Sequence, residues 1–380
     1  MCNEEGSFLI YMDHAATTPL RREVLQAMLP YMSEHYANAS SSYALARASR
    51  RAIDAARAQV AALIGAQSDE IYMTSGGSEA DNWALIGAVL ALPQERRHII
   101  TTQIEHHAIL KTCEMLEGFH ISVTYLPVNS DGVVDVCEAI RAMSPQTGLI
   151  SVMLANNEIG TIQPVSQIAQ EARKRGILVH TDAVQAVGHI PVDVKKLDVD
   201  LLSMSAHKFG GPKGIGALYI RRGTRIGRYI HGGEQEMGMR AGTENTAAIV
   251  GMGKAAALAS SEMDKSAARL TILRDTFVQK ALSKFSHIRI NGLSAERLPG
   301  HVHMTIDGAD TTLLLMQLDM HGIAASSASA CAAGVTERSH VLRAISNNET
   351  KQADLRFSLG YDTTMEEIDR VIEVLSDLLT

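Results

Sequence analysis

The chain has 380 residues, of which 46% are hydrophobic and 20% charged, and its formal net charge is −7 at pH 7. The length predicts a large domain with a smaller one, the composition is ordinary for a water-soluble protein, and the negative charge gives no electrostatic basis for binding nucleic acid. Because no apolar run is long enough to span a membrane and residues 1–5 lack the pattern of a secretory signal, we expect a cytoplasmic protein.

Helices and strands alternate through the first two thirds of the chain. Apolar periodicity and turn residues predict helices at 22–33, 46–64, 80–92, 108–117 and 165–175. Short apolar runs predict strands at 71–74, 98–102, 122–126, 149–154 and 177–181, with further runs at 199–202 and 217–220. Such alternation is typical of an α/β fold in which helices flank a mostly parallel central sheet.

The pattern changes after about Gly251. A long helix at 254–286 is expected to link two domains. Beyond it we expect strands at 288–291, 301–306, 322–325 and 355–358, and helices at 311–320, 338–345 and 365–379. We therefore predict a large domain at 15–255 and a smaller α+β domain at 256–380, with residues 1–14 packing on the smaller one.

Lys208 and Asp182 follow two of the apolar runs. Lys208 stands in the segment SMSAHKFGGPKGIG, and Asp182 lies one strand-crossover-strand unit before it. Both are therefore expected at the carboxyl edge of one parallel sheet. Pyridoxal phosphate requires such a pair, a lysine amine for its aldehyde carbon and a carboxylate for its ring nitrogen. Taken alone, Lys208 is better explained as a solvated loop lysine beside a tight turn, and its pairing with Asp182 is what favours the cofactor site.

A glycine turn joins the strand at 71–74 to the next helix. The turn Ser75-Gly76-Gly77-Ser78-Glu79 would present free N–H groups at the start of that helix, which is a favourable place for a phosphate. Most glycine turns bind nothing, so this interpretation depends on its agreement with the lysine and aspartate.

Polar side chains follow other strands. One of His106 and His107 is a candidate to stack on a planar ring or to move a proton, and Asn157 could hydrogen-bond an exocyclic oxygen of that ring. Arg356 alternates with apolar residues on a strand and suits bidentate capture of a substrate carboxylate. An ordinary loop or surface position is the alternative for each.

Histidines and cysteines give one further candidate. His301 and His303 share a strand face but lack a third ligand, so we assign them a structural role and expect no metal.

The 4 cysteines form no CxxC pair, which fits a reduced cytoplasm. Cys113 and Cys137 lie on predicted helices and are expected to be buried. Cys331 lies among small residues, and an accessible loop thiol is a candidate nucleophile.

Together these segments resemble the cysteine desulfurases of the NifS/IscS type, within the class V aminotransferase-like group of fold-type I pyridoxal phosphate enzymes. The resemblance extends from Tyr11 to the final helix. It is carried, in order, by the motifs DHAATTP, SGGSEADN, EHHAI, NNEIG, HTDAVQAVG, SAHKFGGPKGIG, MRAGTEN, SSASAC and RFSLG.

The resemblance implies a role for each matching residue. Lys208 would carry the cofactor and move the Cα proton of the substrate, and Cys331 would attack the substrate sulfur. The cofactor would be held by Asp182, Gln185, Asn157, His106, Gly77, Ser78, Ser205, His207 and, from the other subunit of a homodimer, Thr243. The carboxylate of L-cysteine would bind Arg356 and Asn38.

The implied reaction converts L-cysteine to L-alanine and leaves a persulfide on Cys331. The sulfur would pass to an acceptor protein of unknown identity, for iron–sulfur cluster assembly, tRNA thiolation or DNA phosphorothioation. Two other classes stay open. Another enzyme of the fold, such as an aminotransferase or a selenocysteine lyase, would not need Cys331, and a sulfur carrier without pyridoxal phosphate would need only the loop thiol.

Overall fold

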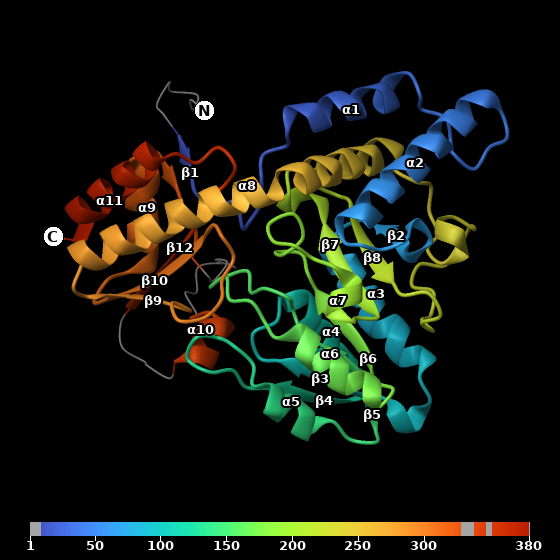
Figure 1. The fold of residues 1–380 in the computed structure, drawn as a ribbon, viewed down its shortest axis with the longest axis horizontal. Coiled ribbons are helices and arrows are strands. Elements are labelled where there is room, and N and C mark those ends of the chain that lie inside the picture. Colours follow the sequence, from blue (N-terminus) through green and yellow to red (C-terminus); the bar gives the residue numbers. More distant parts are fainter. Residues whose placement is uncertain (1–8, 328–337, 347–351, 380) are drawn as a thin grey trace.

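The computed structural model describes residues 9–327, 338–346 and 352–379 (Figure 1). Its larger part is built around a seven-stranded sheet in the order β2-β8-β7-β6-β5-β3-β4. Strand β8 is antiparallel to both neighbours, and the other pairings are parallel. The strands are β2 (Ile71–Thr74), β3 (His98–Thr102), β4 (Ser122–Leu126), β5 (Thr147–Ser151), β6 (Leu178–Asp182), β7 (Leu201–Ser205) and β8 (Gly216–Ile220).

Helices cover both faces of this sheet. Successive residues of a strand point to opposite faces, so neighbouring residues pack against different helices. Ile99 of β3 packs in a core with α3 and α4, whereas the next residue, Ile100, packs in a core with α2 and α6. The helices of this part are α1 (Arg22–Ser33), α2 (Ala44–Leu63), α3 (Gly77–Ala91), α4 (His107–Glu117), α5 (Val136–Ala142), α6 (Val165–Lys174) and α7 (Val194–Leu197). The expected α/β architecture with a mostly parallel sheet is confirmed.

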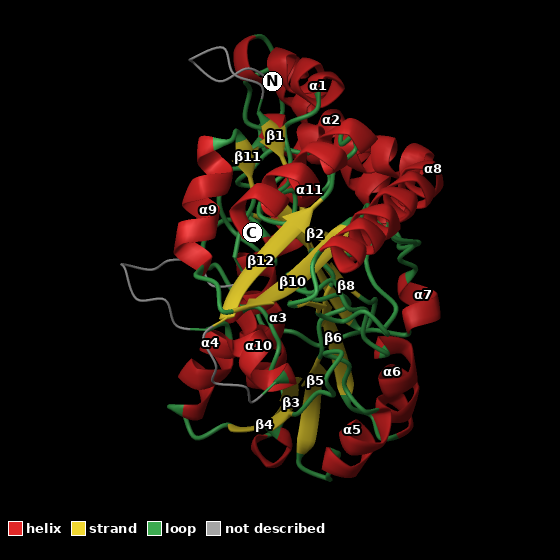
Figure 2. Ribbon diagram, turned by 90° about the vertical axis from the view of Figure 1, so that its left-hand side faces the viewer, coloured by secondary structure: helices red, strands yellow, loops and turns green. Residues whose placement is uncertain are grey.

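The smaller part contains an antiparallel sheet in the order β12-β10-β9 and a parallel pair, β1-β11 (Figure 2). Ile10 and Met12 from the start of the chain belong to its core. Its elements are β1 (Ile10–Tyr11), β9 (Ile288–Ile290), β10 (His301–Asp307), α9 (Thr311–Met320), β11 (Ile323–Ala324), α10 (His340–Ile345), β12 (Gln352–Ser358) and α11 (Met365–Leu379).

Helix α8 (Thr246–Lys284) runs through both parts (Figure 1). It contributes Met252 and Ala256 to the larger core and Phe277 to the smaller one. The domain boundary that we propose, between residues 255 and 256, therefore falls inside one continuous helix. None of the helices in the described ranges is both long and apolar enough to cross a membrane.

Helix α8 begins earlier than its sequence pattern predicts. Gly251 and Gly253 resemble a break, but both lie inside the helix where other helices cross it. A Cβ at Gly251 would lie 2.7 Å from the sulfur of Met28 in α1, and one at Gly253 would lie 2.6 Å from Cα of Ala56 in α2. These glycines permit close helix packing, which sequence periodicity alone does not reveal.

Candidate active site

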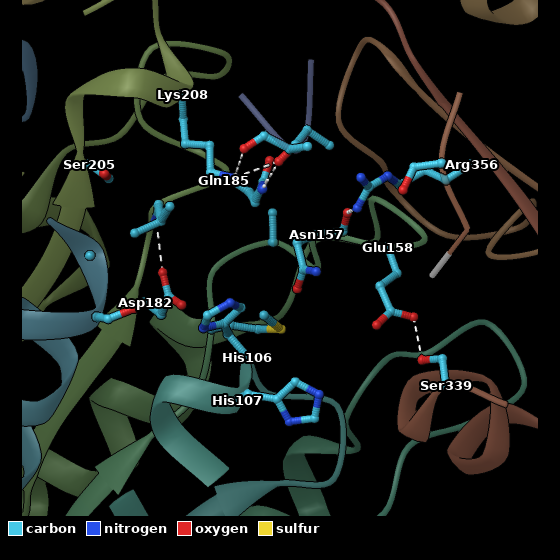
Figure 3. Close-up of a pocket in the computed structure, with 18 of the residues that line it drawn as sticks. His106, His107, Asn157, Glu158, Asp182, Gln185, Ser205, Lys208, Ser339 and Arg356 are labelled. Carbon is cyan, nitrogen blue, oxygen red and sulfur yellow. Dashed lines mark hydrogen bonds between the residues drawn. The ribbon is translucent and has the colours of Figure 1, made fainter. Parts of the chain in front are cut away.

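A cavity of about 870 Å³ opens at the carboxyl edge of the parallel strands (Figure 3). This volume is in the usual range for small-molecule sites. His106 follows β3, Asn157 follows β5, Asp182 ends β6, and Lys208 lies three residues beyond β7. Parallel topology brings these strand ends to one edge although they are distant in sequence.

Lys208 stands at the end of a single turn of 3₁₀ helix. Its amine contacts the backbone of the segment before α1. Nζ donates to the backbone oxygens of Ala15 at 2.5 Å and Ala16 at 2.9 Å. Burial, assisted by the charge of Arg356, lowers the pKa of Lys208 to about 8, against the opposing effect of Asp182. More of the amine is therefore neutral, and hence nucleophilic, close to neutral pH than in an ordinary lysine.

Asp182 is buried at the end of β6. Its Oδ1 accepts a hydrogen bond from the backbone N–H of Val184 at 2.9 Å. Burial raises the pKa of Asp182, while His106 and Lys208 oppose that rise. A cationic ring nitrogen beside this carboxylate would supply the missing counter-charge and favour its ionised form. His106 caps α4, and its Nδ1 accepts from the N–H of Ala108 at 3.1 Å.

The start of α3 forms the anion-binding side of the cavity. No side chain caps this helix, so N–H groups of its first turn stay available to a phosphate. Gly77 keeps the approach open, because a Cβ there would lie 2.7 Å from Cγ2 of Val184. Ser78, Ser205 and His207 also line the cavity. Burial lowers the pKa of His207 to about 4, so its ring is neutral at physiological pH.

Arg356 lies on β12 of the smaller part and reaches across to the larger part. It is 7% exposed. Its Nη2 donates to Oδ1 of Asp13 at 2.7 Å, and its Nη1 donates to the backbone oxygen of Asn157 at 3.1 Å. Its Nε is buried and has no hydrogen-bond partner among the described residues. The guanidinium is thus held in place with donor capacity left for a carboxylate.

The structure places most of the predicted site residues around one cavity. Those that line it are Lys208, His106, Asp182, Gln185, Asn157, Gly77, Ser78, Ser205, His207 and Arg356. Their individual roles stay predictions. In this structure Nε2 of Gln185 donates to the backbone oxygen of Ala15 at 2.9 Å.

Two of the predicted site residues, Asn38 and Thr243, do not line this cavity. Asn38 is exposed, and its side chain accepts from the N–H of Ser40 at 2.9 Å instead of lining the cavity. Thr243 is also exposed and away from this chain's cavity, which leaves its predicted contact with a second subunit open. Cys331 lies outside the described residues. Cys113 is buried as predicted, but Cys137 is exposed, because Ala139 takes the buried position of α5.

His301 and His303 are buried on β10. Nδ1 of His303 lies 2.8 Å from Nδ2 of Asn291, and burial lowers the pKa of His303 to about 3. In the part of the chain that the structure describes, no group of three or more His, Cys, Asp or Glu side chains could hold a metal ion. The two rings are neutral members of the core.

The sequence interpretation missed several residues of the site. Asp13 pairs with Arg356, although the two are 343 positions apart. Glu158 and Ser339 both line the cavity and are joined by a hydrogen bond (Figure 3). Asp13 and Glu158 stand in the motifs DHAATTP and NNEIG, which was the available signal. Their partners, Arg356 and Ser339, are set by contacts between segments that are far apart in the sequence.

These features fit pyridoxal phosphate. The cavity offers a partly neutral lysine amine, a buried carboxylate and an uncapped helix start kept open by a glycine. Fold and site together define a pyridoxal phosphate-dependent enzyme of fold type I. The family model described as "Aminotransferase class-V" matches residues 10–371, and the chain belongs to this family.

Within this family, the chain is similar to proteins described as cysteine desulfurases and NifS-like proteins. "Cysteine desulfurase IscS" of Methanosarcina thermophila is 49% identical over 371 residues, which cover 97% of this chain and 92% of that protein. A solved structure described as a NifS-like protein has a TM-score of 0.92 and 36% identity, covering 98% of this chain and 99% of that one. Another, "SspA in complex with cysteine", has a TM-score of 0.80 and 34% identity over 92% of this chain and 98% of that one.

Proposed function

We propose that this enzyme is a cysteine desulfurase that converts L-cysteine to L-alanine and collects the sulfur on Cys331. The observation that carries the proposal is the single cavity in which the Lys208 amine, the Asp182 carboxylate and the Arg356 guanidinium converge. Names of relatives that are 45–49% identical over nearly their whole length support the same reaction.

Three residues of the cavity have different roles in the proposed reaction. When bound, pyridoxal phosphate supplies the electron sink that lets the Cα proton of an amino acid leave. Arg356 binds the substrate carboxylate and fixes its orientation. Asp182 keeps the cofactor's ring nitrogen protonated, and Nζ of Lys208 receives the Cα proton.

Cys331 completes the reaction. Its thiolate attacks the sulfur of the substrate and forms a sulfur–sulfur bond. The carbon–sulfur bond breaks, its electron pair stays with the three-carbon remainder, and protonation of that remainder gives alanine. The persulfide sulfur then passes to an acceptor protein. An iron–sulfur scaffold, a tRNA-thiolating enzyme and a DNA phosphorothioation system each fit this chemistry.

The proposal includes a cytoplasmic homodimer. Thr243 would reach the phosphate in the cavity of the second subunit, and Asn38 would assist Arg356 at the carboxylate. Both side chains are exposed in the isolated chain and therefore available for such contacts.

Replacing the nucleophile tests the proposed reaction. We expect Cys331→Ala to retain the visible absorbance of bound pyridoxal phosphate but to release no alanine from L-cysteine. The matched control is Cys137→Ala, which removes an exposed thiol far from the strand-end cavity and is expected to keep wild-type turnover. Alanine and sulfide are measured together.

Two outcomes would contradict the proposal. Full alanine production by Cys331→Ala would favour another enzyme of the fold that does not need this thiol, such as a selenocysteine lyase. A protein that stays colourless when pyridoxal phosphate is supplied would favour a sulfur carrier without the cofactor.

A further inference from the structure

The turn after β5 is held rigidly by its own asparagine. Oδ1 of Asn156 accepts from the N–H groups of Glu158 at 2.9 Å and Ile159 at 3.0 Å. Nδ2 of Asn156 donates to the backbone oxygen of Ile104 at 2.9 Å. Asn156 is fully buried. These bonds fix the shape of the turn and join it to the segment after β3, but none of them reaches the C-terminal part of the chain.

Two neighbouring residues of this turn contact two different segments of the C-terminal part. The backbone oxygen of Asn157 accepts from Nη1 of Arg356 at 3.1 Å. Oε2 of Glu158 accepts from Oγ of Ser339 at 2.5 Å (Figure 3). Glu158 and Ser339 are 3% and 7% exposed, so water competes little for this hydrogen bond.

Ser339 also begins α10. Its Oγ accepts from the N–H of Val341 at 3.1 Å, which caps the helix. The next side chain, His340, joins its Nε2 to the backbone oxygen of Glu105 at 2.8 Å. The start of α10 is thus fixed against the segments that follow β3 and β5.

We propose that Glu158 is a positioning residue, which uses its hydrogen bond to Ser339 to hold the Asn157 carbonyl in the place where it orients Arg356. This inference rests on the proposed function, because the substrate carboxylate is the group that Arg356 would bind. Neither Glu158 nor Ser339 needs to touch the substrate. Loss of the bond removes the link between Glu158 and α10, so the Asn157 carbonyl is held less firmly in the position where it accepts from Arg356.

A set of variants tests this role. We expect Ser339→Ala and Glu158→Ala each to raise KM for L-cysteine roughly three- to tenfold, with kcat changed less than about twofold. The double variant should raise KM no further than either single change, because both remove the same bond. Ser339→Thr keeps the hydroxyl and the cap, and is expected to restore KM.

The matched control is Asp310→Ala. Asp310 caps α9 through the N–H of Leu313 at 3.0 Å, so its loss removes a helix cap from the same part of the molecule without touching the turn. We expect thermal unfolding to shift as in Ser339→Ala while KM stays at the wild-type value.

The outcomes separate the two proposals. A wild type that makes no alanine from L-cysteine contradicts the proposed function. An active wild type whose KM equals that of Ser339→Ala contradicts only the positioning role, as does a KM that Ser339→Thr fails to restore. An equal rise of KM in Asp310→Ala would also overturn it, because the effect would then follow stability alone.

Discussion

Lys208 and Asp182 are ionisable groups placed where water is scarce. Burial lowers the pKa of the lysine to about 8 and raises the pKa of the aspartate, so the protein penalises both charges. Two backbone oxygens, of Ala15 and Ala16, still hold the lysine amine in place. The free site therefore contains an amine that titrates near physiological pH and is oriented toward the cavity.

The rate of cofactor loading should report this titration. Below the pKa the ammonium form of Lys208 dominates and has no electron pair to attack an aldehyde. We expect the loading rate of cofactor-free protein with pyridoxal phosphate to rise roughly tenfold per pH unit and to level near pH 8. The rate is followed by visible absorbance, and a blocked free lysine measured in the same buffers should continue to rise beyond pH 8.

Lys208→Ala serves as the control and should acquire no such absorbance at any pH. A profile of the wild type that continues to rise toward the ordinary lysine pKa of 10.5 would contradict the pKa shift.

At the scale of elements, the start of α3 packs closely against the loop after β6. Gly77 and Val184 come from these two segments, and the glycine leaves no room for a side chain between them. Asp182 precedes Val184 and accepts its N–H. The side of the cavity that would bind the phosphate and the side that would bind the ring nitrogen are therefore in contact through Gly77 and Val184.

Gly77→Ala should disturb both sides. The new Cβ, 2.7 Å from Val184, is expected to lower the free energy of unfolding by about 1–3 kcal/mol. It should also weaken binding of pyridoxal phosphate, because Val184 must move. Chemical denaturation and cofactor titration measure the two effects.

Gly227→Ala is the matched control, because its Cβ would meet nothing closer than 3.5 Å. If Gly77→Ala binds the cofactor as tightly as Gly227→Ala, the fit of α3 against this loop has no influence on the cavity.

At the scale of the whole molecule, the site unites the two parts of the chain. Arg356 of the smaller part contacts Asn157, and the start of α10 contacts the segments that follow β3 and β5. Exposed Thr243 extends this arrangement in our proposal to a second subunit.

Mixed dimers test the shared site. A dimer that combines one Lys208→Ala subunit with one Thr243→Ala subunit has one intact cavity if Thr243 acts across the interface. We expect about half of the wild-type activity from such dimers, isolated with two affinity tags, and little from either homodimer. Activity no higher than the mean of the two homodimers would place Thr243 in its own subunit's site, or in none.

Local sequence already determined the alternation of elements and the common edge of Lys208 and Asp182. Apolar periodicity is a local property, and parallel strands must end at the same side of a sheet. The motifs also indicated the family, which the family model and the relatives confirm. The roles of the individual site residues, including Cys331, stay predictions.

Only the tertiary structure decided which groups that are distant in the sequence meet in space. The pairing of Asp13 with Arg356 joins residues 343 positions apart, and that of Glu158 with Ser339 spans 181 positions. Gly251 and Gly253 likewise lie inside α8, where the absence of a side chain lets Met28 and Ala56 pack closely against the helix. Hydrogen bonds and close packing depend on distances in space, which residue periodicity along the chain does not encode.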